Sequence, residues 1–401
     1  MIKKLITPCN LYVGLWLLII LNPSFAFMPD SLSIALLFLL FLWSLVYTAQ
    51  CFLSNNESKY IRVLNILFVI FTIYGFLRFV GGETYYIWIS GNNTPVGPRE
   101  FLISYWRSIL PIYAFIHFTR NGQLSEKGLT IWTVVFFICA IVGYFGEESQ
   151  RMAMIPVGTM QDGVTNNQGY AILSILPLTA FFRKKPIIQY FMFAIILVFS
   201  IMSYKRGAMV IAFFSILCGL FLFKNKSKFF GFLRVAIIAS VLIFITINLF
   251  NWNIENSSYF MMKLEDTLSG ENSGRRMIFT QLAEYLLDQT SLLTMMIGAG
   301  ADATFLIIGQ AAHNDWLEIA VDMGLFGLIA YVAYYICFFK FLIDSKAYST
   351  EIHQCVFFLF LICFLRSFFS MSINDMSLYL TMAVGYSVSM VYNKSMSNVV
   401  G

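Results

Sequence analysis

Long apolar runs separated by short polar segments dominate the chain. Twelve of these runs are long enough, at roughly 17 to 25 residues, to cross the hydrocarbon core of a bilayer as helices. We place the predicted spans at residues 8–27, 32–53, 61–80, 101–119, 128–146, 166–182, 187–203, 207–223, 230–250, 314–341, 353–371 and 376–392. One connection is much longer than the others, a polar stretch over residues 251–312. The pattern predicts an all-α integral membrane protein, one polytopic domain over residues 1–401, with one large, partly helical loop between the ninth and tenth spans.

Composition supports the same class of protein. Hydrophobic residues make up 59% of the chain and charged residues only 12%. Because so few polar side chains cannot cover the surface of a soluble globule, ordinary water-soluble enzymes are excluded.

The basic residues predict an orientation, because lysine and arginine concentrate in the cytoplasmic loops of membrane proteins. With both termini in the cytoplasm, most basic residues lie on that side, namely Lys3, Lys4, Lys59, Arg62, Arg120, Lys127, Arg183, Lys184, Lys185, Lys224, Lys226, Lys228, Arg234, Lys340, Lys346 and Lys394. The same orientation places Asp30, Glu147, Glu148, Asp162 and the 251–312 loop at the outer face. The net charge of +5 therefore reflects topology, and we expect no nucleic-acid partner.

Ser24-Phe25-Ala26 after the first apolar run resembles a signal-peptide cleavage site. Cleavage there would invert the charge bias of every later loop, so we expect an uncleaved first helix. All seven cysteines fall in predicted spans, which argues against a disulfide framework in the large loop. His117 and His353 lie near cytoplasmic helix ends, far from His313, so we expect neither a bound metal nor another cofactor.

The end of the large loop carries the residues best suited to bind a substrate or to react with it. Arg275 and Arg276 supply adjacent guanidinium groups, which suit phosphate and other anions. Gly298-Ala299-Gly300 predicts a flexible turn ahead of His313. Asp315 followed by Glu318 reads as a capping box, which places His313 just outside a helix start, facing water or a ligand.

Two features of the loop and the following helix predict how this region is arranged. The stretches 259–268 and 277–287 have helical periodicity, with Met277, Leu282, Tyr285 and Leu286 forming one apolar stripe. Helices of this kind could form a lid over a cavity, or lie at the interface with arginines on lipid headgroups. Asp315, Glu318 and Asp322 share one face of the next helix. The first two are expected to cap or to pair with arginines, and Asp322 to need a buried cationic partner.

Other cations near the outer face are weaker candidates. Lys205 and Arg206 stand there against the orientation rule, which favours a functional role for Arg206 above all, although lipid headgroup contact is the alternative. Arg107 is the best functional candidate among Arg78, Arg99 and Arg107, each of which is otherwise read as a snorkelling or paired arginine. Arg366, Asn374 and Asp375 receive supporting roles.

In this order, four groups of residues resemble the bacterial O-antigen polymerase and ligase superfamily. They are Tyr204-Lys205-Arg206-Gly207-Ala208, Ser273-Gly274-Arg275, Gly298-Ala299-Gly300, and Ala312-His313-Asn314-Asp315-Trp316-Leu317-Glu318 with Gly324-Leu325-Phe326-Gly327. The resemblance implies a multi-spanning glycosyltransferase with a GT-C-like fold. It would act at the periplasmic face of the inner membrane on undecaprenyl-diphosphate-linked glycans, with a flippase and a chain-length regulator as candidate partners besides membrane lipid.

Arg206, Arg275 and His313 match the positions that carry function in the superfamily. Two fixed guanidinium groups would stabilise the diphosphate as it leaves the sugar. His313 is either the general base for the acceptor hydroxyl or a ligand of a phosphate oxygen. Further substrate contacts are expected from Lys205, Arg276, Arg107, Asn314, Asp315, Glu318 and Asp322. Direct attack predicts inversion at the anomeric carbon without a metal.

Three functions follow, in order of preference. The Asn-Asp-Trp-Leu-Glu sequence after His313 favours a polymerase that joins lipid-linked repeat units. The alternative is a ligase that transfers the glycan to lipid A-core. A transporter or flippase of lipid-linked glycans is the remote third, because the chain shows neither an internal repeat nor paired interrupted helices.

Overall fold

The computed structural model describes residues 7–54, 58–81, 85–89, 92–154, 166–223, 247–248, 275–288, 291–370 and 376–400. The predicted ninth span (230–250) lies almost entirely outside these ranges. The loop helix expected at 259–268, together with Asn374 and Asp375, lies wholly outside them.

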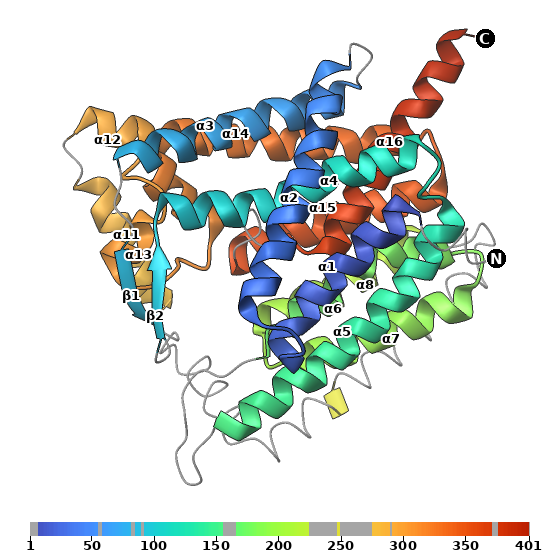
Figure 1. Cartoon of the computed structure of the whole chain (residues 1–401), viewed down its shortest axis with the longest axis horizontal. Helices are drawn as coiled ribbons and strands as arrows, with labels where there is room; N and C mark the ends of the chain where they lie inside the picture. Colours follow the sequence, from blue (N-terminus) through green and yellow to red (C-terminus); the bar gives the residue numbers. More distant parts are fainter. Residues whose placement is uncertain are drawn as a thin grey trace.

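The described residues form helices and one hairpin (Figure 1). The α-helices are α1 (Pro8–Phe25), α2 (Asp30–Leu53), α3 (Lys59–Gly81), α4 (Pro98–Arg120), α5 (Glu126–Met154), α6 (Gln168–Leu173), α7 (Pro186–Met202), α8 (Arg206–Leu222), α11 (Arg275–Leu287), α12 (Leu292–Ile297), α13 (Ala303–Ile308), α14 (Asp315–Ser345), α15 (Thr350–Phe369) and α16 (Leu378–Val400). The remaining elements are the 3₁₀ helix η2 (Leu176–Phe182) and the strands β1 (Tyr85–Ile89) and β2 (Asn92–Val96).

The helices confirm the predicted class of an all-α integral membrane protein. Among the described residues, five segments are long and apolar enough to cross a membrane: Asp30–Leu53, Lys59–Phe76, Glu126–Ser149, Asp315–Ser345 and Thr350–Phe369. Shorter apolar helices occupy Pro8–Pro23, Gln168–Phe182, Pro186–Met202, Arg206–Leu222 and Leu378–Val391. These segments fall within or close to predicted spans, because long apolar runs report directly on burial in lipid or in a helical core.

Two local features differ from the sequence-based picture. The predicted sixth span is not one continuous helix, because α6 ends at Leu173 and the chain continues as η2, which has Pro177 near its start. In addition, β1 and β2 pair antiparallel, with Tyr85 opposite Val96 and Ile89 opposite Asn92. Aromatic and β-branched residues in β1 favour an extended strand. The hairpin connects α3 to α4.

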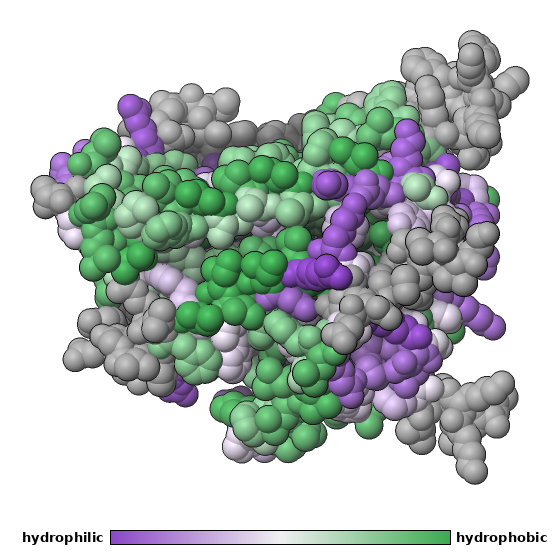
Figure 2. All heavy atoms as spheres, turned by 90° about the horizontal axis from the view of Figure 1, so that it is seen from above, coloured by the Kyte–Doolittle hydropathy of each residue, from purple (hydrophilic) through white to green (hydrophobic). Residues whose placement is uncertain are grey.

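α4 lies at the centre of the packing and contacts α2, α3 and α16, while α15 contacts η2, α8 and α14. Aromatic rings fill much of the core, for example Tyr12, Tyr113 and Phe115, which are fully buried. The outer surface is also apolar: Figure 2 shows hydrophobic residues over much of one face. Phe38 is 62% exposed and Ile187 is 83% exposed. Apolar exposure on this scale indicates a surface covered by lipid.

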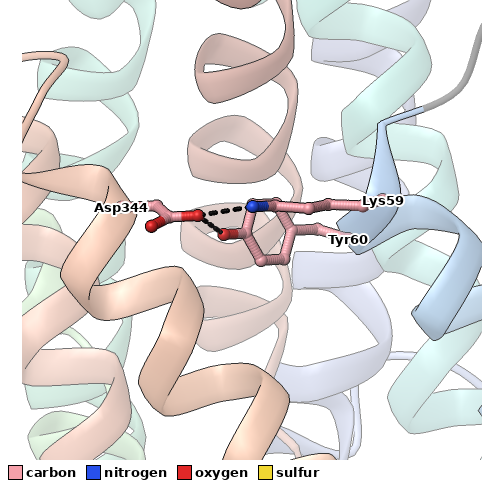
Figure 3. Close-up of polar contacts among 3 residues, drawn as sticks. All are labelled: Lys59, Tyr60 and Asp344. Atoms are coloured by element: carbon pink, nitrogen blue, oxygen red, sulfur yellow. Dashed lines mark hydrogen bonds and ion pairs between the residues drawn. The ribbon is translucent and has the colours of Figure 1, made fainter.

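Exposed ion pairs join helix ends at one end of the bundle. Lys59 Nζ at the start of α3 lies 2.6 Å from Asp344 Oδ2 near the end of α14, and the Tyr60 hydroxyl donates to the same oxygen (Figure 3). Lys184, between η2 and α7, lies near the carboxylates of Glu126 and Glu351. These contacts join elements far apart in sequence.

An apolar cavity of about 90 Å³ lies between α3, α4, α14 and α16. Tyr60 and Phe341 line one part of it, and Met376 and Val388 line another. Since its lining offers neither charged groups nor the candidate residues, we assign no chemistry to this cavity.

Candidate active site at the helix ends opposite the ion pairs

His313 lies in a turn just ahead of α14, and its side chain is exposed, as predicted. The predicted cap is wrong by one residue. Asn314, not Asp315, is the N-cap, and its Oδ1 accepts from the backbone N–H of Leu317 at 3.1 Å. His313 itself has a left-handed backbone with φ of 52°. A non-glycine residue in this conformation is uncommon and persists where its surroundings hold it.

Asp315 and Glu318 do not reach outward as substrate ligands. Asp315 is 2% exposed, and its Oδ2 accepts from the Tyr331 hydroxyl at 2.6 Å. Glu318 is 7% exposed, and its Oε2 is buried. Both side chains therefore lie inside the structure at the start of α14.

Gly298-Ala299-Gly300 docks onto a kink in α14. Gly324 has φ of 64° inside this helix, and a Cβ atom there would lie only 2.5 Å from the Gly298 nitrogen. The N–H of Ala299 donates to Val321 O at 2.8 Å, and the N–H of Gly300 donates to Asp322 O at 3.0 Å. The predicted flexible turn is thus a fixed contact between two backbones, and glycine is needed on both sides of it.

Asp322 is held by backbone amides, which corrects the prediction of a cationic partner. Its Oδ2 accepts from the N–H of Asp302 at 3.1 Å and its Oδ1 from the N–H of Thr304 at 3.0 Å. The Tyr74 hydroxyl donates to the main-chain oxygen of Asp322. Asp322 therefore fastens the segment before α13 to α14, and α14 to α3.

Asp302 in turn binds the segment between β2 and α4. Its Oδ2 accepts from the N–H of Gly97, the residue before α4, at 2.8 Å. Asp302 is 8% exposed. Burial raises the pKa of its carboxyl from 3.8 to about 6, the Gly97 N–H opposes the rise, and nearby Glu100 adds to it.

α11 packs on the residues around His313. Ile278 and Leu282 of α11 form a small core with Ala303, Ala312 and Val321. The predicted helix over 277–287 is confirmed, and Leu282, Tyr285 and Leu286 of its predicted apolar stripe do face this core. Met277 does not, because it is 59% exposed and Ile278 is buried instead. Arg276 is exposed.

Arg275 is the first residue of α11. This helix contacts both α13 and α14. The backbone of Arg275 thereby belongs to the same small subdomain as the His313 turn. Its side chain lies outside the described part of the structure.

Arg206 begins α8 in a turn built like that of His313. Tyr204, two residues before the helix, is also left-handed, with φ of 56°. The N–H of Asn166 donates to Ser203 O at 3.2 Å, which ties the turn to the segment before α6. Arg206 is exposed and Lys205 is partly buried.

The end of α15 connects the two turns. Trp316 Nε1 at the start of α14 donates to Ser367 Oγ at 3.0 Å. Two residues further along α15, Phe369 lies close to Gly207, where an added Cβ would be 3.0 Å from Phe369 Cβ. Gly207, next to Arg206, and Trp316, three residues after His313, therefore both lie against the final turn of α15.

Arg366, to which the sequence analysis gave a supporting role, is buried in the last turn of α15. It is 3% exposed, and its guanidinium carbon lies 4.8 Å from the ring centroid of Tyr170. Tyr170 in turn contacts Gly207. A buried arginine in an apolar helix is costly, so its position inside a predicted span was the available signal.

The last candidate of the sequence analysis is Arg107. Arg107 is exposed on α4, where the adjacent Ser108 accepts from the N–H of Met376 at 3.1 Å. Within the described ranges, His, Cys, Asp and Glu form no group of three or more that could hold a metal ion.

The segment that contains these turns matches a known family. Residues 191–332 match a family model described as O-Antigen ligase. This match supports the resemblance of the chain to the O-antigen polymerase and ligase superfamily. The matched range includes Arg206, Arg275 and His313, but it does not separate polymerase from ligase. No curated protein matches the chain.

The family match indicates a glycosyltransferase-like membrane enzyme of O-antigen assembly. The residues described above lie at helix starts, where backbone N–H groups favour anions. A turn with an exposed imidazole and a turn with an exposed guanidinium at one end of a helical bundle suit a substrate that carries both phosphate and sugar.

Proposed function

We propose that the protein is an O-antigen polymerase that joins undecaprenyl-diphosphate-linked oligosaccharide repeat units at the periplasmic face of the inner membrane. The observation that carries this proposal is the common contact of the Arg206 and His313 turns with the final turn of α15. The family match over residues 191–332 supports the reaction class.

Arg206 and Arg275 act as the diphosphate clamp. Displacement of a lipid diphosphate from the anomeric carbon builds negative charge on the leaving group, and fixed guanidinium groups stabilise that charge where water is scarce. Removing one such donor from an enzyme lowers the rate by about 10² to 10³-fold. Lys205 and Arg276 flank the clamp and add positive charge.

His313 acts either on the acceptor hydroxyl or on the diphosphate. As a general base it takes the proton of the attacking hydroxyl, and as a ligand it donates to a phosphate oxygen. Either role agrees with an exposed imidazole in a fixed turn. Direct attack by the acceptor inverts the anomeric carbon and requires no metal.

The orientation of the chain follows from its basic residues. Lys59, Lys184 and Lys346 lie at or beside helix ends opposite the His313 turn, which supports a periplasmic location for that turn. Residues 251–312 then form the periplasmic loop, and α11 in this loop covers the start of α14. We propose that this loop is the lid of the active site.

Reconstitution tests the proposal. Purified protein in proteoliposomes with lipid-linked repeat units is expected to produce a ladder of longer glycans on a gel. Arg206→Ala, Arg275→Ala and His313→Ala are each expected to abolish the ladder. Arg183→Ala and His353→Ala, at the opposite helix ends, are the matched controls and should extend glycans like the wild type. Extension by all three site variants would refute the assignment, and glycan movement without extension would indicate a transporter.

A ligase is the second candidate, because the matching family model carries that description. The acceptor would then be lipid A-core. The lipopolysaccharide of a deletion strain separates the two functions: core with one repeat unit indicates a lost polymerase, and bare core indicates a lost ligase.

A further inference from the structure

The apolar cavity between α3, α4, α14 and α16 is elongated along two of these helices. On α3 its lining begins at Tyr60 and recurs three, four and seven residues later, ending at Leu67. On α14 the lining begins at Tyr334 and recurs at the same spacing, ending at Phe341. This spacing marks one face of each helix over about two turns, or about 10 Å along the helix axis. The cavity therefore runs parallel to α3 and α14.

The helix faces beside this cavity are apolar and exposed. Ile66, next to the lining residue Leu67, is 58% exposed, and Ile336, next to the lining residue Cys337, is 63% exposed. Both helices are long and apolar enough to cross a membrane. A hydrocarbon chain that runs along the spans matches this cavity in polarity and in direction.

One end of the cavity carries exposed cations. Lys59 directly precedes the lining residue Tyr60, and Arg62 is its neighbour three residues further along α3. Lys340 directly precedes the lining residue Phe341 on α14. The rings of Tyr60 and Phe341 lie 4.8 Å apart between their centroids, so the cation-bearing ends of α3 and α14 meet at this end of the cavity.

Asp344 balances part of this positive charge. Its Oδ2 lies 2.6 Å from Lys59 Nζ (Figure 3), yet the Lys59 side chain remains 60% exposed. Because an ammonium group has three donors, Lys59 can bind a second acceptor. Arg62 and Lys340 are exposed beside it, and their charges exceed that of the one carboxylate.

We propose that the cavity and this cationic rim bind an anionic phospholipid, with one acyl chain in the cavity and the phosphate at Lys59, Arg62 and Lys340. Basic groups at the ends of spanning helices attract anionic headgroups. The rim lies at the end of α14 opposite the His313 turn. An isoprenoid carrier held at that turn by its diphosphate would bring an uncharged chain to the rim, which favours a phospholipid as the occupant.

Photocrosslinking of the wild-type chain tests where the acyl chain lies. The protein is placed in phosphatidylcholine nanodiscs with a trace of phosphatidylglycerol that carries a diazirine in one acyl chain. Mass spectrometry is expected to locate most adducts within residues 60–67 and 334–341, and excess unlabelled phosphatidylglycerol should reduce them several-fold. Adducts spread evenly over other lipid-facing helices overturn the site. Adducts that undecaprenyl phosphate suppresses, and phosphatidylglycerol does not, overturn the phospholipid as occupant.

A pair of valine variants tests the cavity itself. Val63→Phe fills the cavity, whereas Val69→Phe places the same ring on a side of α3 where the valine is already 38% exposed. Val63→Phe is expected to lower the yield of these adducts at least fivefold, and Val69→Phe to leave it within twofold of wild type. Equal yields in the two variants contradict binding in the cavity.

A pair of charge variants tests the rim. Lys59, Arg62 and Lys340 replaced together by glutamine should weaken retention of phosphatidylglycerol, measured by native mass spectrometry, at least about tenfold, since each basic residue near an anionic headgroup contributes about fivefold. The matched control replaces the three basic residues at 183–185, which lie between η2 and α7, by glutamine. Equal retention in the two triple variants overturns the assignment of the headgroup.

Discussion

The two ends of the helical bundle use carboxylates in different ways. Where α3 begins and α14 ends, Asp344 pairs with Lys59 and Tyr60 in contact with solvent, and its side chain is 35% exposed. Where α14 begins, Asp322 and Asp302 are buried and accept from backbone amides. The first arrangement contributes little, because water screens exposed ion pairs. The second fixes backbone segments.

This difference bears on function. The Asp322 carboxylate holds the backbone of Asp302 and Thr304 against α14, and the Asp302 carboxylate holds the segment before α4. The frame around His313 is therefore built from neutral backbone donors. We expect changes in the buried end to affect both stability and turnover, and changes in the exposed end to affect neither strongly.

The largest expected effect on stability comes from adding a side-chain atom where the backbones of Gly324 and Gly298 are in contact. Gly324→Ala places a Cβ 2.5 Å from Gly298 N at a residue with φ of 64°. Strain and overpacking together are expected to destabilise the protein by about 3 kcal/mol or more. Unfolding in detergent, followed by intrinsic fluorescence, measures the change.

Gly309→Ala is the control for this substitution. Gly309 has φ of 73° but no heavy atom within 4 Å of an added Cβ. It therefore carries the conformational strain without the collision. Equal losses in the two variants would show that the docking of Gly298 on Gly324 is unimportant.

A smaller effect, dependent on pH, is expected at Asp302. Burial raises the pKa of this carboxyl from 3.8 to about 6, so the folded state holds the proton more tightly than the unfolded chain. The stability that Asp302 contributes therefore falls as the pH rises from about 4 through 6. Asp302→Asn keeps an acceptor for the Gly97 N–H without the charge.

The asparagine variant should accordingly be more stable than the wild type at pH 8, by up to about 3 kcal/mol. The difference should disappear near pH 4. Detergent unfolding at a series of pH values measures it. A difference that grows toward acid pH would contradict the burial of this carboxyl.

At the exposed end, Lys59→Met and Asp344→Asn should each change stability by at most about 1 kcal/mol. Glycan extension should be unaffected, since the pair joins α3 to α14 far along the chain from the His313 turn. High salt should reduce even this small effect. Loss of turnover in either variant would mean that the two ends are coupled.

No effect at all is expected from EDTA on glycan extension. The sequence lacks a cluster of histidine, cysteine and carboxylate residues at metal-ligand spacing around His313. Inhibition that added Mg²⁺ reverses would show a metal requirement and would change the proposed chemistry.

Some parts of the site were accessible from sequence. The apolar run after Leu317 predicted α14, and the position of His313 just ahead of it followed from polar residues at a helix start. The cap itself was misplaced by one residue, from Asn314 to Asp315, because both residue types favour N-caps. The helix over 277–287 was predicted, but not which of Met277 and Ile278 faces inward.

The sequence alone determined the membrane class, the positions of most helices and the family motifs, because long apolar runs and short local patterns are properties of neighbouring residues. Only the tertiary structure determined which residues contact one another. Gly298 lies on Gly324, Asp322 binds the amides of residues 302 and 304, and Phe369 meets Gly207. Periodicity reports whether a side chain is buried, whereas the partner of a buried polar group depends on segments brought together only by folding.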